Sequence, residues 1–414
     1  MSEFINNQSL RKAKLKEALL QIHQGKPYEE VKAVFREILS NATAGEIAEI
    51  EQTLISEGLP VEDIQYLCDV HVAMFRESLD QQVVPEMTPG HPVYTFRAEN
   101  ELAALALNDS RLALERYKAQ PNGDNRQKLL DSLRKLKTYD NHYLRKENLL
   151  FPYLEKYGFS GPSNVMWGIH DDVRKGWKQM IAILESNRPD SVEIAKEVAD
   201  VFTPIENAIR EMFYKEENIL IPNSLERLSE DDWRAIYNQE DDFGFSFAVR
   251  GTDWPEANVQ KSPDKDTIMP NQQTERIETM SDYPLTHGDL TIKQIDMMLK
   301  NLPVDITFVD ENDTVRYYSE SPERIFKRTP AIIGRQVQNC HPPASVDKVL
   351  KIVEDFKAGK RDVAEFWIQM NGKFIYIRYF AMRDAAGAYK GTVEVSQDLT
   401  ELRKLEGEKR LLED

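Results

Sequence analysis

Three segments of the sequence place a glutamate and an asparagine where an amphipathic helix would bury them. They are YTFRAEN (94–100), HYLRKENLLFP (142–152) and MFYKEENILIP (212–222). A carboxylate that is buried without a partner costs on the order of several kcal/mol. We therefore expect Glu99, Glu147 and Glu217 to meet either a bound cation or basic side chains in the interior of the fold.

Helical spacing assigns further polar residues to inward faces. In chain order they are His91 and Glu99 on the first helix, Glu147 on the second, His170 on the third, and Glu216 with Glu217 beside it on the fourth. Imidazole and carboxylate groups from facing helices can surround one or two iron atoms in a helix bundle. Their occurrence on four successive helices favours a metal site.

A second interpretation of the same residues needs no metal. Basic and aromatic side chains near the three segments would neutralise the carboxylates through ion pairs and hydrogen bonds. The candidates are Arg97, Arg145, Lys146, Arg210, Lys215, Tyr94, Tyr143 and Tyr214. For any single carboxylate this internal network is the more common arrangement, whereas the whole set on four helices favours metal.

The elements that must position these residues are four long helical patterns within residues 84–234. They cover 91–118, 124–157, 163–187 and 190–221, and the connections between them are short and rich in turn residues. This organisation predicts an antiparallel up-down four-helix bundle. Residues 1–83 precede it as a small helical domain with short helices between Gly and Pro breakers.

The bundle is followed by a change of period. Residues 235–285 are polar and contain several prolines, which predicts a linker, with FGFSFAV (243–249) as a candidate short strand. Residues 286–405 contain two strands, short helices and then three antiparallel strands, with Asn371-Gly372 suited to a tight hairpin turn. Residues 406–414 begin an amphipathic C-terminal signalling helix. The expected fold is multidomain and mainly α, with an α/β domain at the end.

Three segments carry a family resemblance. A hemerythrin-like (HHE) cation-binding domain is resembled by HYLRKENLLFPYLEKYG and MWGIHDDVR, which correspond to its second and third helices. The helical domain of unknown function 438 is resembled by EGLPVEDIQYLCDVH. A PAS sensor domain is resembled by residues 302–343. The resemblance implies a non-heme di-iron site, whereas the residues present indicate a site that is carboxylate-rich, reduced or lost. The implied ligands are His91, Glu99, His142, Glu147, His170, Glu216 and Glu217. The chain departs from the family at Tyr94 and Met212, where histidine is expected.

The composition limits the classes of partner and the compartment. The 414 residues carry a net charge of −17, which disfavours nucleic acid and anionic membranes. No apolar stretch is long enough to span a membrane, and the amino terminus lacks a secretory core. Two cysteines far apart, Cys68 and Cys340, indicate free thiols and a cytoplasmic setting. Cys68 and His71 lie one helical turn apart and are either a metal pair or ordinary packing residues.

The PAS-like segment contains its own candidate ligands. Cys340 and His341 are possible heme-iron ligands, although the HPP sequence that includes His341 is also typical of a helix start. Arg378 alternates with aromatic residues on one face of a strand, where it would meet either an anionic ligand or an acidic neighbour. No other catalytic pattern is recognisable in the sequence, so we expect no catalytic residue in the chain.

These observations predict a cytoplasmic sensory protein. The bundle would bind iron and respond to oxygen, nitric oxide or redox state, and the PAS domain would sense a second signal or relay the first to a protein partner, with a homodimer formed through the PAS domain and the C-terminal helix. The alternatives are a di-iron enzyme that handles oxygen, peroxide or nitric oxide or repairs iron clusters, a metal-free interaction scaffold, and a heme-binding PAS sensor.

Overall fold

The structure of the chain is a computed structural model. The chain forms two compact units, residues 1–260 and 261–414. It describes residues 85–255 and 290–408, apart from positions 249, 322 and 323, together with scattered positions between 13 and 54. His23, Cys68 and His71 lie outside the described residues, and so does most of the predicted N-terminal helical domain.

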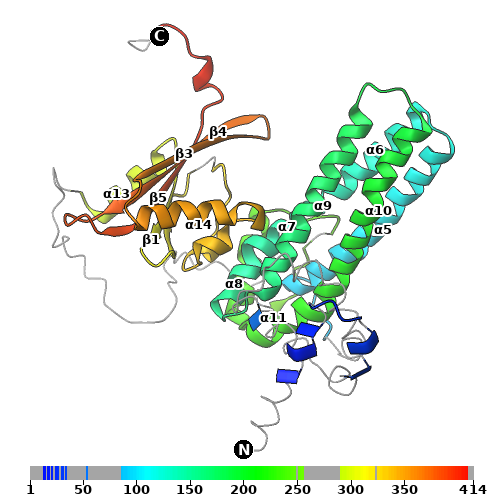
Figure 1. Cartoon of the computed structure of the whole chain (residues 1–414), viewed down its shortest axis with the longest axis horizontal. Coiled ribbons are helices and arrows are strands. Elements are labelled where there is room, and N and C mark those ends of the chain that lie inside the picture. Colours follow the sequence, from blue (N-terminus) through cyan, green and yellow to red (C-terminus); the bar gives the residue numbers. More distant parts are fainter. Residues whose placement is uncertain are drawn as a thin grey trace, which may run out of the picture. The chain divides into compact units, whose positions relative to one another are not determined.

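The first unit contains the four-helix bundle (Figure 1). Its long helices are α5 (Pro92–Ala119), α6 (Gly123–Lys137), α9 (Gly161–Glu185) and α10 (Val192–Lys215). Two of the predicted helices are interrupted. The second breaks after α6 and continues as α7 (Asp140–Arg145), a π-helical turn (Lys146–Leu150) and α8 (Phe151–Lys156); the fourth continues through a π-helical turn (Glu216–Leu220) into α11 (Ile221–Arg227).

The two π turns explain the asparagines of the repeated segments. Each turn is followed by a proline, Pro152 or Pro222, which has no N–H to continue the ordinary helical ladder. The wider turn is closed instead by backbone hydrogen bonds between residues five positions apart. In the first turn the Phe151 N–H donates to the carbonyl of Lys146. The Asn148 amide donates to the carbonyl of Leu144 (2.8 Å) and the Asn218 amide to that of Tyr214 (2.9 Å). These side chains supply donors to carbonyls at the start of the widened turns.

The linker prediction is wrong for residues 235–255. Helix α12 (Glu230–Gln239) begins with a capping box from Ser229 and Asp232 and continues into a 3-10 turn (Glu240–Asp242). The residues after it return along the bundle, where Ser246 and Trp254 are buried. The described residues of the FGFSFAV segment form bends, not the predicted strand.

The second unit is built on a five-stranded antiparallel sheet with the order β2-β1-β5-β4-β3. The strands are β1 (Asp305–Asp310), β2 (Val315–Tyr318), β3 (Val363–Met370), β4 (Lys373–Arg383) and β5 (Tyr389–Asp398). The predicted hairpin turn is present, because Asn371 (φ 53°) and Gly372 (φ 77°) both adopt the left-handed conformation that a primed two-residue turn requires. The helices are α13 (Ile292–Asn301) and α14 (Pro343–Lys357).

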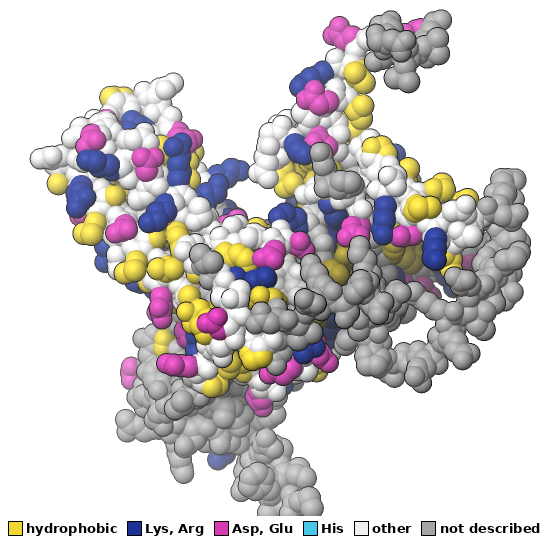
Figure 2. All heavy atoms as spheres, turned by 180° about the vertical axis from the view of Figure 1, so that it is seen from behind, with side chains coloured by type: hydrophobic (Ala, Val, Ile, Leu, Met, Phe, Trp, Pro, Cys, Tyr) yellow, Lys and Arg dark blue, Asp and Glu magenta, His cyan; other side chains and the backbone are white. Residues whose placement is uncertain are grey.

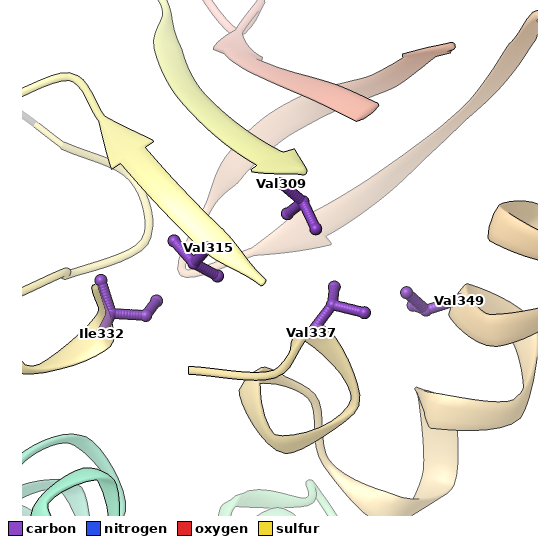
Figure 3. Packing of buried hydrophobic residues seen from close by; sticks show 5 residues of the cluster. All are labelled: Val309, Val315, Ile332, Val337 and Val349. Atoms are coloured by element: carbon purple, nitrogen blue, oxygen red, sulfur yellow. The ribbon is translucent and has the colours of Figure 1, made fainter. Parts of the chain in front are cut away.

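One part of the core of this unit lies between the sheet and the connecting segments. Figure 3 shows Val309 and Val315 from two strands facing Ile332, Val337 and Val349 from the helical side. The segment PAIIGRQV forms only two short 3-10 turns, Pro330–Ile332 and Val337–Cys340. Of the predicted C-terminal signalling helix, only residues 406–408 are described; they are not helical, and the turn before them, Leu402–Lys404, is a 3-10 turn. Residues 409–414 lie outside the described part.

Surface charge is mixed in sign. Figure 2 shows lysine, arginine, aspartate and glutamate side chains interspersed over the visible face. A nucleic-acid groove needs clustered basic residues, and no large basic patch appears on that face. Among the described residues, no helix is long and apolar enough to cross a membrane.

The candidate site is a charged core inside the bundle

The interior of the bundle contains ionisable side chains with almost no contact with solvent. Each is no more than 2% exposed: Glu99, His142, Arg145, Lys146, Glu147, His170, Glu216 and Glu240. Helical spacing correctly placed Glu99, Glu147, His170 and Glu216 inside. The structure divides them into two groups, one around His142 and one around Glu147.

His142 lies at the centre of the first group. Its Nδ1 is 2.9 Å from a Glu99 oxygen and its Nε2 is 2.9 Å from a Glu216 oxygen. The ring therefore bridges two buried carboxylates, one at each nitrogen. The group therefore joins α5, α7 and the second π turn.

Two basic side chains complete the first group. Lys146 pairs with the other oxygen of Glu216, and Arg145 pairs with Glu99 and also, at 3.0 Å, with Glu240. The two π turns are thereby joined directly, because Lys146 of the first turn contacts Glu216 of the second. These are charge-assisted contacts in a buried interior of low dielectric, where opposite charges attract strongly.

Neutral groups donate further hydrogen bonds to the carboxylates of the first group. The Asn100 amide donates to Glu216 at 3.0 Å, and the Tyr139 hydroxyl donates to Asn100. The backbone N–H of Ser246, from the segment after α12, donates to Glu99 at 2.6 Å. Each of the two carboxylates thus accepts from two donors in addition to its contact with His142.

The second group is centred on Glu147. Both of its oxygens accept from Arg174 (2.8 and 2.9 Å), which also contacts Asp140 at 2.7 Å. The Nδ1 of His170 lies 2.7 Å from Glu147, and its ring stacks on Tyr143 with 4.0 Å between centroids. The other nitrogen of His170 has no hydrogen-bond partner among the described residues. The Glu147–Arg174 pair has the bidentate geometry of strong Arg–carboxylate contacts.

The pKa values within the core move in opposite directions. Burial acts to raise the pKa of Glu216, but the charges of Lys146 and His142 outweigh it and lower the pKa to about 2. Burial raises the pKa of Glu147 to about 7 despite Arg174, and raises the pKa of Glu240 to about 7 despite Arg145. Burial also lowers the pKa of His170 well below its usual range, so its ring is neutral.

Two of the predicted ligands lie outside both groups. His91 caps the start of α5 by accepting from the Val93 N–H (3.1 Å), and its ring packs against Trp233 and Trp254. Burial lowers the pKa of His91 to about 4. Glu217 pairs with Arg97 at 2.8 Å, and its side chain is 32% exposed. His91 therefore lies apart from the charged core, whereas Glu217 lies at its edge, where it interacts with Asn100 and with the charge of Glu216.

Sequence inspection missed Arg174, Glu240 and Ser246. Arg174 follows His170 by four residues, so helical spacing alone was enough to place it on the same face. Glu240 belongs to an acidic run, QEDD, that resembles a solvated surface. Ser246 acts through its backbone, which no pattern of side chains predicts.

These residues do not fit a di-iron centre. Both carboxylates that face His142 already have a basic partner: Glu99 pairs with Arg145, and Glu216 pairs with Lys146. A metal placed there would lie beside two buried cations, which repel it in a low-dielectric interior. Only one histidine belongs to each group, and among the described residues no set of three His, Cys, Asp or Glu side chains is placed to hold a metal ion.

The second unit contains a small cavity of about 20 Å³. Its lining is almost wholly apolar and comes from Val309, Val337, Val349, Ile352 and Val353, together with His341, Tyr379, Thr392 and Glu394. This volume is close to that of one or two water molecules and is far too small for heme. The Nδ1 of His341 is 2.9 Å from the carbonyl of Val337, and the Cys340 thiol donates to the carbonyl of Gln336 (3.5 Å).

Arg378 does not face this cavity. The residues beside it on β4, Ile377 and Tyr379, are the buried ones, so Arg378 is on the opposite face of the sheet. Its guanidinium lies over the rings of Tyr376 (5.3 Å) and Phe380 (5.4 Å), and Glu365 is its partner across the strands. Of the two predicted alternatives, the acidic neighbour matches the register.

A four-helix bundle with inward carboxylates and imidazoles, followed by a PAS-type sheet, defines a multidomain hemerythrin-like protein of sensory or regulatory type. The comparisons with family models agree with this class. Residues 91–223 match the hemerythrin HHE cation binding domain, residues 295–400 a PAS domain, and residues 15–81 a family of unknown function, DUF438. The chain is a hemerythrin HHE-domain protein that also contains a DUF438 segment and a PAS domain.

Solved structures give partial matches. The C-terminal domain of a Streptococcus mutans protein is 39% identical, with 31% of this chain and 98% of that chain covered and a TM-score of 0.29. A sensory box sensor histidine kinase from Vibrio cholerae is 10% identical (26% and 89% covered, TM-score 0.21), and the PAS domain from Bordetella pertussis BvgS is 18% identical (27% and 92% covered, TM-score 0.23). No curated protein matches the chain.

Proposed function

We propose that the chain is a sensory protein whose PAS domain receives a signal of diatomic size, and whose bundle responds to it and is held by internal ion pairs in place of iron. The PAS cavity supports the first half of the proposal, because its volume of about 20 Å³ and its almost wholly apolar lining suit a ligand of that size. The pairing of the core carboxylates supports the second half and is the observation that carries the proposal.

All four carboxylates of the charged core have a basic side chain within ion-pair distance. The pairs are Glu99–Arg145, Glu216–Lys146, Glu147–Arg174 and Glu240–Arg145. Buried carboxylates need a positive charge nearby, and here the arginine and lysine side chains of the protein provide it. The proposal corresponds to the metal-free alternative among the sequence-based hypotheses.

The iron-dependent alternatives start from the HHE domain match, which describes a cation-binding family. They require that ferrous iron displace Lys146 and Arg145 from Glu216 and Glu99. A sensor of oxygen or nitric oxide, or a di-iron enzyme, would then lose its metal when His142 or Glu147 is replaced. The ion-paired account expects these replacements to change stability and leave metal content unchanged.

The sensory role itself is tested by filling the PAS cavity. Val349 lines the cavity, and the Val349→Met variant adds enough volume to occupy it. If the PAS domain signals to the bundle, amide hydrogen exchange in residues 85–255 of the full chain should change by at least about threefold at several positions. The matched control is Lys351→Met, because Lys351 is on the same helix with a side chain that is 60% exposed.

Two outcomes of this measurement decide the proposal. A response of the bundle to Val349→Met and none to Lys351→Met supports signalling between the two units. Unchanged exchange in the bundle, while the β4 and β5 amides remain protected, shows that the PAS domain is folded but does not act on the bundle, and this contradicts the proposal.

A further inference from the structure

A strap of chain, here defined as the described residues of 243–254, closes over the charged core. Its C-terminal anchor is Trp254, which is 5% exposed. The Trp254 N–H donates to the carbonyl of Pro89 (2.9 Å), and its ring contacts those of His91 (4.9 Å) and Tyr237 (5.7 Å). This end of the strap holds the entry to α5 against α12.

The N-terminal anchor of the strap is Ser246, which has no exposed surface. Its hydroxyl donates to the carbonyl of Thr138 (2.6 Å), at the break between α6 and α7. Its N–H donates to Glu99, and the ring of the adjacent Phe245 lies 4.5 Å from the guanidinium of Arg145. The strap therefore contacts both members of the Glu99–Arg145 ion pair.

The middle of the strap is held in a close and strained geometry. A side chain on Gly251 would place its Cβ 2.6 Å from the carbonyl carbon of Pro89, so only glycine permits this approach. Phe247 has a positive φ of 59°, which is costly for a bulky residue. Arg250 stacks on Tyr237 at 3.8 Å and donates to its carbonyl at 2.8 Å. Strain of this kind persists only while the anchors hold.

From these contacts we infer that the strap is a latch that couples the Glu99–Arg145 ion pair of the charged core to the segment leading to the PAS domain. Glu99 accepts from Arg145 and from the Ser246 N–H, so a change that breaks this ion pair weakens the anchor of the strap as well as the core. The strap ends at Trp254, and the chain then continues from residue 255 towards the second unit. Release of the strap adds its own residues to the stretch of chain that separates the anchored part of the bundle from the second unit. The inference does not depend on what the PAS cavity binds.

The test is hydrogen exchange in the full chain, comparing two core carboxylates. Glu99→Gln should speed exchange at Ser246 and the neighbouring strap amides by about tenfold or more, because a hydrogen bond to a charged acceptor is lost. Glu216→Gln is the matched control: Glu216 is equally buried in the same core but has no described contact with the strap. It should leave strap exchange within about twofold of the wild type.

A second variant keeps the test decisive if Glu99→Gln does not fold. Trp254→Ala removes the far anchor, and a strap that moves as one unit then releases Ser246 as well, about eight residues away along the chain. Faster exchange at Ser246 in Trp254→Ala supports the latch. Equal acceleration of the strap in Glu99→Gln and Glu216→Gln, or an unchanged Ser246 amide in Trp254→Ala, overturns it.

Discussion

Replacing Lys146 with methionine should lower the free energy of unfolding of the bundle by about 3–5 kcal/mol. The substitution leaves Glu216 fully buried without its basic partner, while methionine keeps most of the volume of the side chain. Urea unfolding of the full chain, followed by tryptophan fluorescence, measures the change. Four of the five tryptophans (167, 177, 233 and 254) lie in the bundle unit, so the signal reports mainly on it.

Two controls separate the buried pair from a general effect of removing a lysine. Lys175→Met breaks an exposed ion pair with Asp172 and should change the free energy of unfolding by no more than about 0.5 kcal/mol. The double variant Lys146→Met, Glu216→Gln removes the unpaired charge and should recover much of the loss. A loss below about 1 kcal/mol in Lys146→Met would show that Glu216 is neutralised by something other than Lys146.

Replacing Arg174 with methionine should destabilise the bundle by about 2–3 kcal/mol at pH 8, less than the Lys146 variant because Arg174 is 24% exposed. The loss depends on pH. The pKa of Glu147 is about 7 in the folded protein, above its ordinary value of 4.5, so the folded state binds the proton more tightly than the unfolded state. Stability from this group therefore falls as pH rises from 4.5 through 7.

The destabilisation by Arg174→Met should accordingly be smaller at pH 5.5 than at pH 8, since a protonated Glu147 no longer needs a cation. Urea unfolding at the two pH values measures the difference. In the double variant Arg174→Met, Glu147→Gln the additional pH dependence should disappear. A loss that is equal at both pH values would mean that Glu147 does not take up a proton in this window.

The sequence predicted which side chains of the bundle point inward better than it predicted which side chains they contact. Glu147, His170 and Glu216 follow helical periodicity, which is a local property, and their burial was therefore predictable. Lys146 is next to Glu147 in the chain but contacts Glu216, seventy residues away. That pairing depends on two π turns, and a pattern based on 3.6 residues per turn does not anticipate them.

A similar division applies to the two units. The β-strands and the Asn371-Gly372 turn were predicted because alternation and turn chemistry act over a few residues. Residues 235–255 were predicted as linker because their polar composition hides isolated anchors, such as Ser246 and Trp254, that are buried one at a time. The C-terminal helix was predicted from an amphipathic pattern; just before it, Leu402 and Leu405 are at least half exposed, and the described residues there form only a 3-10 turn.

The measurement that tests the central claim most directly is the iron content and optical spectrum of the full chain after anaerobic purification, followed by addition of ferrous iron and then oxygen. The ion-paired core predicts less than about 0.2 iron per chain and no new absorption, because folding already provides the charges that a metal would supply. Lys146→Met is compared under the same conditions. Close to one or two irons per wild-type chain, lost in His142→Gln or Glu147→Gln, would contradict the account and restore the iron-dependent alternatives.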